Sequence, residues 1–217
     1  MPRELEAIRT EYLEAQLAGD QRTALRVVRQ ALADGHPVRA LQGEVVQAAQ
    51  LEIGRLWQEN RISVAHEHMA TAISQVALVH LIEHAEMATA RERKVVVACV
   101  EGEQHDLPAR LVADYLELAG FDIRFLGANV PSDSLASVVA IERPDVLALS
   151  MTMSFNARGL EAAVTSVRAR CPGLPILVGG HALDWLPELA SKLGVIAVTG
   201  SPDAIVAAVE RTLESTK

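Results

Sequence analysis

The sequence predicts an α/β protein whose N-terminal part is a four-helix bundle and whose C-terminal part contains a five-stranded parallel sheet. Two observations predict this class. Before residue 92, apolar residues recur every three or four positions, which is typical of amphipathic helices. After residue 93, short apolar runs alternate with helical segments, which is typical of parallel strands joined by helical crossovers. We therefore expect a helical bundle domain at residues 1–90 and an α/β domain at residues 91–217.

Four helical stretches account for the first part. They begin near Leu5, Leu25, Leu41 and Ser63. Gly19 and Gly35 close the first two stretches, and the third extends to Trp57. Serine is a residue type preferred at helix N-caps, so Ser63 is a plausible start for the fourth. Because the connections are short, the stretches are expected to pack as an antiparallel bundle.

Five strands and five helices alternate in the second part. The strands are expected at residues 94–100, 122–126, 146–150, 176–178 and 195–199. The helices are expected near residues 107–119, 132–142, 157–170, 182–192 and 202–214. Right-handed crossovers put such helices on both faces of the sheet, so we expect a flavodoxin-like (Rossmann-like) domain.

Composition excludes several classes of protein. Apolar residues make up 50% of the 217 residues, which is enough for a sizeable core. The formal net charge of -8, without any basic run, argues against direct nucleic-acid binding. No apolar run approaches the ~18 residues that a membrane-spanning helix needs. The two cysteines, Cys99 and Cys171, fit a reducing compartment, and we expect a cytoplasmic protein.

Polar or glycine-rich segments follow three of the predicted strands. They are residues 101–106, Ser150-Met151-Thr152 and Gly179-Gly180-His181. Open parallel sheets bind ligands at the carboxyl ends of their strands, so these segments are expected to form one site. The sequence has neither G-x-G-x-x-G nor G-x-x-x-x-G-K-[ST], which disfavours a dinucleotide or a nucleoside triphosphate. The first loop is also acidic, which repels phosphate.

The first of these loops contains a carboxylate two residues before a histidine, Glu103 and His105. A carboxylate that hydrogen-bonds one imidazole nitrogen fixes the tautomer and makes the other nitrogen a better metal ligand. His105 is therefore the candidate metal ligand. Taken alone, the pair is equally compatible with a solvated loop.

The three segments together identify a resemblance. Residues 94–217 resemble the cobalamin-binding domain of methionine synthase, corrinoid carrier proteins and cobalamin-dependent mutases. That family carries D-x-H-x-x-G, S-x-[LT] and G-G after its first, third and fourth strands. This chain has E-x-H-x-x-P at residues 103–108, Ser150-Met151-Thr152 and Gly179-Gly180. Glutamate thus replaces the family's aspartate, and Pro108 replaces its last glycine.

The resemblance implies a role for each of these loops. His105 would coordinate cobalt on the lower face of the corrin, and Glu103 would hydrogen-bond the imidazole. The nucleotide tail of the cofactor would enter a slot lined by the remaining motif residues. Those residues are Ser150, Thr152, Gly179 and Gly180. Their loop neighbours Asp106, Leu107 and His181 complete the candidate site.

A second motif lies in the helical part, which resembles the cap domain that precedes such domains. Nine residues separate Trp57 from Glu67-His68, and W-x9-E-H is the cap motif of light-sensing cobalamin proteins. There the tryptophan covers the upper adenosyl group, and the Glu–His pair contacts it. Several light-sensing repressors carry a histidine after the tryptophan, where this chain has Gln58; His66 or His68 could substitute.

The resemblance implies an adenosylcobalamin-binding light sensor, not an enzyme. The cofactor would lie between the two domains, and light-driven cleavage of its cobalt–carbon bond would change the assembly of a homo-oligomer. The output is expected at a protein partner, either a transcription regulator or a signalling enzyme. Repressors of this type begin with a DNA-binding domain, whereas this sequence begins in the cap, so we expect a stand-alone module. A bilin such as biliverdin is left open as a second chromophore.

The runner-up function is that of a corrinoid carrier subunit in a methyltransferase system, which would share the lower-ligand motif. Other residues have less specific interpretations. His80 and His84 are four residues apart, with Glu83 between them, and could hold a metal, but a solvated helix face is favoured since no third ligand lies nearby. Trp185 is expected to pack at the domain edge, and Cys99 to be a buried strand residue.

Overall fold

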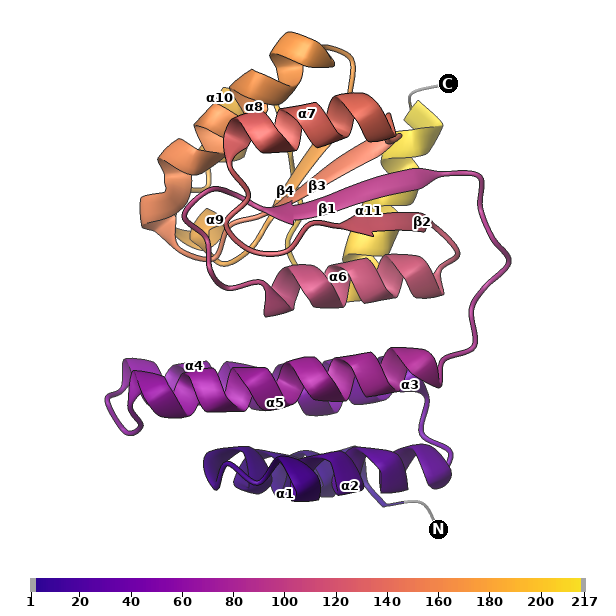
Figure 1. Cartoon of the computed structure of the whole chain (residues 1–217), viewed down its shortest axis with the longest axis vertical. Helices are drawn as coiled ribbons and strands as arrows, with labels where there is room; N and C mark the ends of the chain where they lie inside the picture. The colour runs from indigo at the N-terminus through magenta and orange to yellow at the C-terminus, as the bar shows by residue number, and fades with distance from the viewer. Residues whose placement is uncertain (1–2, 216–217) are drawn as a thin grey trace. The chain divides into compact units, whose positions relative to one another are not determined.

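The computed structural model describes residues 3–215 and divides into two compact units, Met1–Glu86 and Met87–Lys217 (Figure 1). The first unit is helical, and the second is an α/β domain, which confirms the predicted fold class. The sequence places the boundary at residue 90, whereas the units part after Glu86. The ends of the predicted domains, residues 1–2 and 216–217, lie outside the described residues.

The helical unit contains the four expected helical stretches. Its elements are α1 (Leu5–Leu17), α2 (Gln21–Ala33), α3 (Val38–Ala40), η1 (Leu41–Gln47), α4 (Ala48–Gln58) and α5 (Val64–Glu83). The third stretch is not one regular helix, because η1 is a π-helical segment of 7 residues between α3 and α4. The wider π turn buries Leu41, Gln42, Val45 and Val46 together. Ser63 holds the N-cap position of α5, but its hydroxyl pairs with the His66 ring at 2.7 Å.

All five predicted strands are present and parallel. They are β1 (Lys94–Cys99), β2 (Asp122–Phe125), β3 (Val146–Ser150), β4 (Ile176–Gly179) and β5 (Ile196–Ala197). Their order in the sheet is β2-β1-β3-β4-β5, the flavodoxin-like order. The strand order reverses at β1 and β3, and the helices that follow these two strands, α6 (Leu107–Leu118) and α8 (Ala157–Arg170), pack on opposite faces of the sheet. Open sheets of this kind bind their ligands at such a position.

Helices cover both faces of the sheet (Figure 1). Val95, Val97 and Cys99 of β1 pack with α6 and α11 (Pro202–Ser215). The alternate residues Val96 and Ala98 pack with α7 (Ser132–Glu142) and α8. Cys99 is fully buried as predicted, and burial raises the pKa of its thiol to about 12.

Two predictions about the last third of the chain are wrong. The expected helix at 182–192 is interrupted, giving α9 (Ala182–Trp185) and α10 (Leu189–Leu193). Pro187 lacks an N–H and disfavours the helical conformation at Leu186, where φ is -129°. Trp185 does not pack at the domain edge; it is 80% exposed, because α9 ends there after one turn.

The fifth strand is also shorter than expected, since only Ile196–Ala197 pair with β4. As the last strand in the sheet order, it pairs with a single neighbour, β4, among residues 3–215. Within residues 3–215, no helix combines the length and the apolar character needed to cross a membrane.

Gly120 provides a test of the packing in the α/β unit. Its φ is +90°, and a Cβ added there would lie 2.3 Å from the Thr89 carbonyl oxygen. We expect Gly120→Ala to lower the free energy of unfolding by more than ~1 kcal/mol, through backbone strain and this clash. Gly127→Ala is the matched control, because φ is +79° there but no described atom lies within 4 Å of the added Cβ. Equal destabilisation of the two variants in urea unfolding would contradict the close contact.

Candidate functional site

The three loops singled out by sequence converge at one edge of the sheet. Cys99 at the end of β1 pairs with Ser150 at the end of β3, and Ser150 pairs with Gly179 at the end of β4. Because these strands are parallel and adjacent, the segments that follow them begin side by side. The sheet topology therefore brings the predicted lower-ligand loop next to the predicted slot residues.

The Glu103 carboxylate joins the loops after β1 and β3. Its side chain is fully buried. Oε1 lies 2.5 Å from His105 Nδ1 and accepts a hydrogen bond of 2.9 Å from the His105 backbone N–H. Oε2 accepts from the backbone N–H groups of Thr152 and Met153, at 2.8 and 2.9 Å, and from the Asn156 side-chain amide at 3.1 Å. One carboxylate thus fixes the position of two loops.

Glu103 remains ionised despite its burial. Burial alone would raise its pKa, but the hydrogen bonds from His105, Met153 and Asn156 outweigh this effect and lower the pKa from 4.5 to about 2. An ionised carboxylate can only accept hydrogen bonds, so the proton between the two groups belongs to His105 Nδ1. A negative charge is thereby held against one side of the imidazole.

His105 is oriented for coordination through its other nitrogen. With Nδ1 donating to Glu103, Nε2 is the nitrogen at which a metal could bind, and the neighbouring carboxylate increases its basicity. The His105 side chain is 40% exposed, so a ligand can reach it. Asp106 occupies the N-cap position of α6, and Pro108 lies in the first turn, where proline is well tolerated. Leu107 is buried, so its side chain belongs to the interior of the domain.

The predicted slot residues differ in burial, hydrogen bonding and backbone conformation. Thr152 Oγ1 is buried and has no hydrogen-bond partner among residues 3–215, so it can accept or donate to an incoming polar group. Ser150 is nearly buried at the end of β3. Gly180 has a φ of +110°, and a Cβ there would lie 2.3 Å from the Met151 carbonyl oxygen. Gly180 is therefore required by the protein's own packing. His181 is exposed, and its Nδ1 lies 3.3 Å from Oδ2 of Asp184.

Two asparagines complete the candidate site, and no motif in the sequence predicts either of them. Asn156, just before α8, donates to Glu103 from 53 residues away. Asn129, with a φ of +50°, accepts from the Gly102 N–H at 2.8 Å and donates its own N–H to the Glu103 carbonyl. Asparagine is enriched in the left-handed conformation, but nothing in the local sequence indicates these distant partners.

In the helical unit, the W-x9-E-H residues lie on both sides of the turn that joins α4 to α5. Trp57 lies in the last turn of α4 and is partly buried, while Glu67 and His68 lie in the first turn of α5. The Glu67 carboxylate is 15% exposed and accepts hydrogen bonds from Thr71 Oγ1 (2.8 Å) and Gln50 Nε2 (3.3 Å). Its second oxygen lies 2.7 Å from Nδ1 of His68, whose side chain is 74% exposed.

A buried hydrogen-bond network extends from Glu67 into the bundle. Gln50 Oε1 accepts from the Ser74 hydroxyl at 3.1 Å, and Ser74 accepts from Gln16 Nε2 at 2.8 Å. Tyr12 OH lies 3.4 Å from the same hydroxyl. Burial raises the pKa of Tyr12 to about 12, and the Ser74 contact offsets only part of that effect. The network holds Glu67 through residues of α1, α4 and α5.

The outer face of α5 is apolar as well. Exposed apolar residues recur there with helical spacing, at Ala65, Met69, Ala72, Val76 and Val79. A helix with apolar residues on opposite sides has a surface suited to a second apolar contact. This surface starts in the same turn as Glu67 and His68.

The ionisation of Glu103 predicts a pH-dependent stability. Because its pKa is lower in the folded protein than in the unfolded chain, the carboxylate stabilises the fold above pH ~5, and this contribution is lost as pH falls towards 2. Glu103→Gln should therefore destabilise the protein at pH 7, on the order of 3 kcal/mol. The difference from wild type should shrink between pH 5 and pH 3 in urea unfolding. A difference that does not change with pH would contradict the assignment.

Both parts of the chain match models of known families. A B12 binding domain model matches residues 93–210, and a second model with the same description matches residues 8–82. Among curated proteins, the HTH-type transcriptional repressor CarH of Myxococcus xanthus is 31% identical over 199 residues. The dimethylamine corrinoid protein 2 of Methanosarcina acetivorans is 30% identical over 112 residues.

These relatives are longer than the matched regions. The CarH match covers 91% of this chain but 66% of CarH, and the corrinoid protein match covers 50% of this chain and 51% of the relative. Among solved structures, the monomethylamine corrinoid protein of Methanosarcina barkeri has a TM-score of 0.78 at 18% identity. That match covers 96% of this chain and 100% of the solved chain, and it shows a shared fold. With a helical and an α/β B12-binding domain in succession, the chain belongs to the family of cobalamin-binding domain proteins.

Proposed function

We propose that the protein is an adenosylcobalamin-binding light sensor rather than an enzyme. The observation that carries this proposal is the placement of the cap motif. Trp57 lies in the last turn of α4 and Glu67 in the first turn of α5, where Gln50 and Thr71 hydrogen-bond the Glu67 carboxylate. The similarity to a transcriptional repressor over 91% of the chain adds support.

The residues at the sheet edge fit the lower side of a cobalamin. His105 Nε2 is the proposed cobalt ligand, and Glu103 fixes the tautomer that leaves this nitrogen for the metal. Thr152 Oγ1 offers an unused hydrogen-bonding group to the nucleotide tail, beside Ser150, Gly179 and Gly180. Imidazole nitrogen suits cobalt better than a hard carboxylate oxygen, so Asp106 is not a substitute.

The cap residues fit a bulky upper ligand. The indole of Trp57 offers a flat apolar surface, and the Glu67 carboxylate can accept hydrogen bonds from ribose hydroxyls. Bound adenosylcobalamin would supply a cobalt–carbon bond that visible light breaks. Trp57 and the apolar face of α5 would then lose a contact, and this loss is the difference between states that a switch requires.

We propose that the output is a change in homo-oligomeric state or in binding to a protein partner, such as a transcription regulator or a signalling enzyme. The net charge of -8 disfavours direct contact with nucleic acid. A bilin, such as biliverdin, is a proposed optional second chromophore. The absorption spectrum of protein produced with both pigments would identify it.

A corrinoid carrier subunit of a methyltransferase system is the second candidate. The 30% identity to a dimethylamine corrinoid protein over half of the chain favours it. A carrier must expose the upper face of the corrin to a partner enzyme, whereas a sensor must cover it. The lower-ligand loop cannot distinguish the two functions, because both would use His105.

The two functions are separated by one experiment. The protein is loaded with adenosylcobalamin in darkness, and its mass is measured by light scattering before and after green light. A sensor should retain the adenosyl form in darkness and change its mass or partner binding after illumination. Failure to retain that form, or illumination that leaves both the mass and partner binding unchanged, would contradict the sensor. Methyl transfer with a partner enzyme would then favour the carrier.

His105→Ala should lose the histidine-ligated absorption spectrum and bind cobalamin more weakly, because the proposed ligand is removed. His84→Ala is the matched control, since that histidine is exposed and belongs to none of the residues proposed to contact cobalamin. Spectra and affinities are compared by titration with adenosylcobalamin. An unchanged spectrum and affinity in His105→Ala would reject the assignment.

Trp57→Ala should still bind cobalamin through His105 but should discriminate less between adenosyl and methyl forms. Burial of an indole is worth a few kcal/mol, so the preference should fall by at least about tenfold. Trp185→Ala is the control, because that tryptophan is 80% exposed. Retention of both the adenosyl preference and the light response in Trp57→Ala would make the W-x9-E-H match coincidental.

A further inference from the structure

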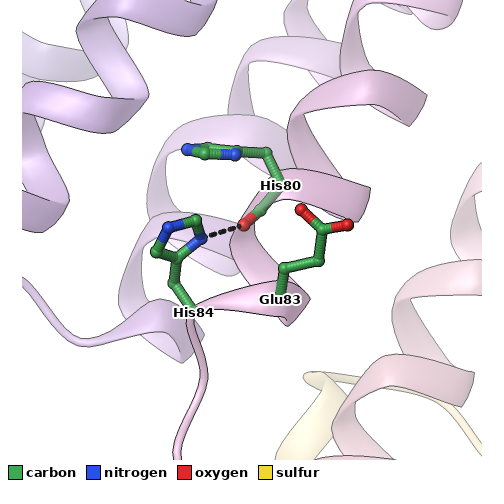
Figure 2. Close-up of side chains that lie close together, drawn as sticks. All are labelled: His80, Glu83 and His84. Carbon is green, nitrogen blue, oxygen red and sulfur yellow. Dashed lines mark hydrogen bonds between the residues drawn. The ribbon is translucent and has the colours of Figure 1, made fainter.

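The last turn of α5 brings together three side chains that the proposed function does not use. They are His80, Glu83 and His84, and Figure 2 shows them on neighbouring positions of the helix end. One ligand atom from each lies within 4.8 Å of the others. The spacing of the two histidines alone favours a solvated face, because it supplies no third ligand. Glu83 is that third group: Glu83 and His84 follow His80 by three and four residues, so each can share a helix face with His80.

The orientation of His84 is that of a metal-binding histidine. Its Nδ1 lies 2.8 Å from the His80 carbonyl oxygen, drawn as the dashed line in Figure 2. A carbonyl can only accept, so Nδ1 carries the proton and Nε2 carries the lone pair. The His80 carbonyl is available to the imidazole because the His84 backbone N–H donates to the Leu81 carbonyl and not to the His80 carbonyl. Histidines that bind metals commonly donate their other N–H to a backbone carbonyl in this way.

The position and charge of the cluster favour a cation. The two imidazole centroids are 4.4 Å apart. Zinc–nitrogen bonds of ~2.0–2.1 Å put the ligands of a tetrahedral site about 3.3 Å apart, so modest side-chain rotation would close the site. A cation at a helix C-terminus also interacts favourably with the helix dipole.

We propose that His80, Glu83 and His84 bind one divalent transition-metal ion of the zinc class, with water completing its coordination. Two imidazoles and one carboxylate suit zinc or a similar ion better than magnesium or calcium, which prefer all-oxygen sites. The bound ion links the side chains of residues 80, 83 and 84 at the C-terminal end of α5. This site is independent of cobalamin and of the proposed light response.

Metal binding is tested on the untagged full-length protein without cobalamin. Calorimetric titration with Zn²⁺ should give one saturable site, and Zn²⁺ should raise the melting temperature. Titration with Co²⁺ should give the visible absorption of a four-coordinate ion. His80→Ala and His84→Ala should each weaken binding at least tenfold. His84 is exposed, so its variant is expected to fold normally, which circular dichroism checks.

Three further variants make the test specific. His66→Ala removes an exposed histidine near the other end of α5 and should leave the Zn²⁺ affinity unchanged. His105→Ala removes the other candidate metal ligand and should also leave it unchanged. Arg29→Gln removes a positive charge that interacts with His80 and would repel a bound metal cation. This variant should therefore bind Zn²⁺ more tightly. Absence of saturable binding, or binding that survives in His80→Ala and His84→Ala, would overturn the proposal.

Discussion

The α/β site depends on the hydrogen bonding of one buried carboxylate. Glu103 accepts from the loop that follows β3 with one oxygen and from His105 with the other. Burying a carboxylate is costly unless hydrogen bonds replace its water, and here they outweigh the cost, since the pKa falls to about 2. The resulting fixed charge determines the position of the loops and the tautomer of the histidine. The glutamate that replaces the family's aspartate thus preserves the carboxylate–histidine hydrogen bond.

The helical unit repeats this arrangement with a different scaffold. Glu67 is mostly buried and paired with an exposed histidine, His68, as Glu103 is with the partly exposed His105. In the α/β unit the carboxylate is held by backbone N–H groups at the strand ends. In the bundle it is held by Thr71 and by Gln50, which leads into the buried network of Ser74. In both units the interior fixes a carboxylate, and the carboxylate orients an imidazole at the surface.

Much of the fold could be predicted from sequence because its signals are local. The apolar runs of β1, β3 and β4 and the helical spacing of α1 and α5 are readable without tertiary information. Pro187 is a local signal for the interruption between α9 and α10. No comparable local pattern predicts the π-helical segment at Leu41–Gln47. The exposure of Trp185 depends on how α9 ends, which is a property of the folded chain.

The residues of the candidate site could be selected from the sequence only where they lie in local motifs. Glu103, His105 and the slot residues lie in local motifs. Asn129 and Asn156 act on Glu103 and its loop from 27 and 53 residues away, and such pairings exist only after folding. Likewise, the sequence shows Glu83 beside His84, but only the structure shows that its carboxylate lies near both imidazoles.

The central claim is that Glu103 orients His105 to bind cobalt through Nε2. Electron paramagnetic resonance of the reduced, cobalt(II) form of the loaded protein tests it most directly. In unlabelled protein, coupling to one axial nitrogen should split the cobalt lines into triplets. In protein labelled with nitrogen-15 histidine, these should become doublets if a histidine is the axial ligand, and His105→Ala should abolish the change. Triplets that persist in the labelled protein would mean that cobalt keeps a nitrogen ligand of its own, and this would contradict the account.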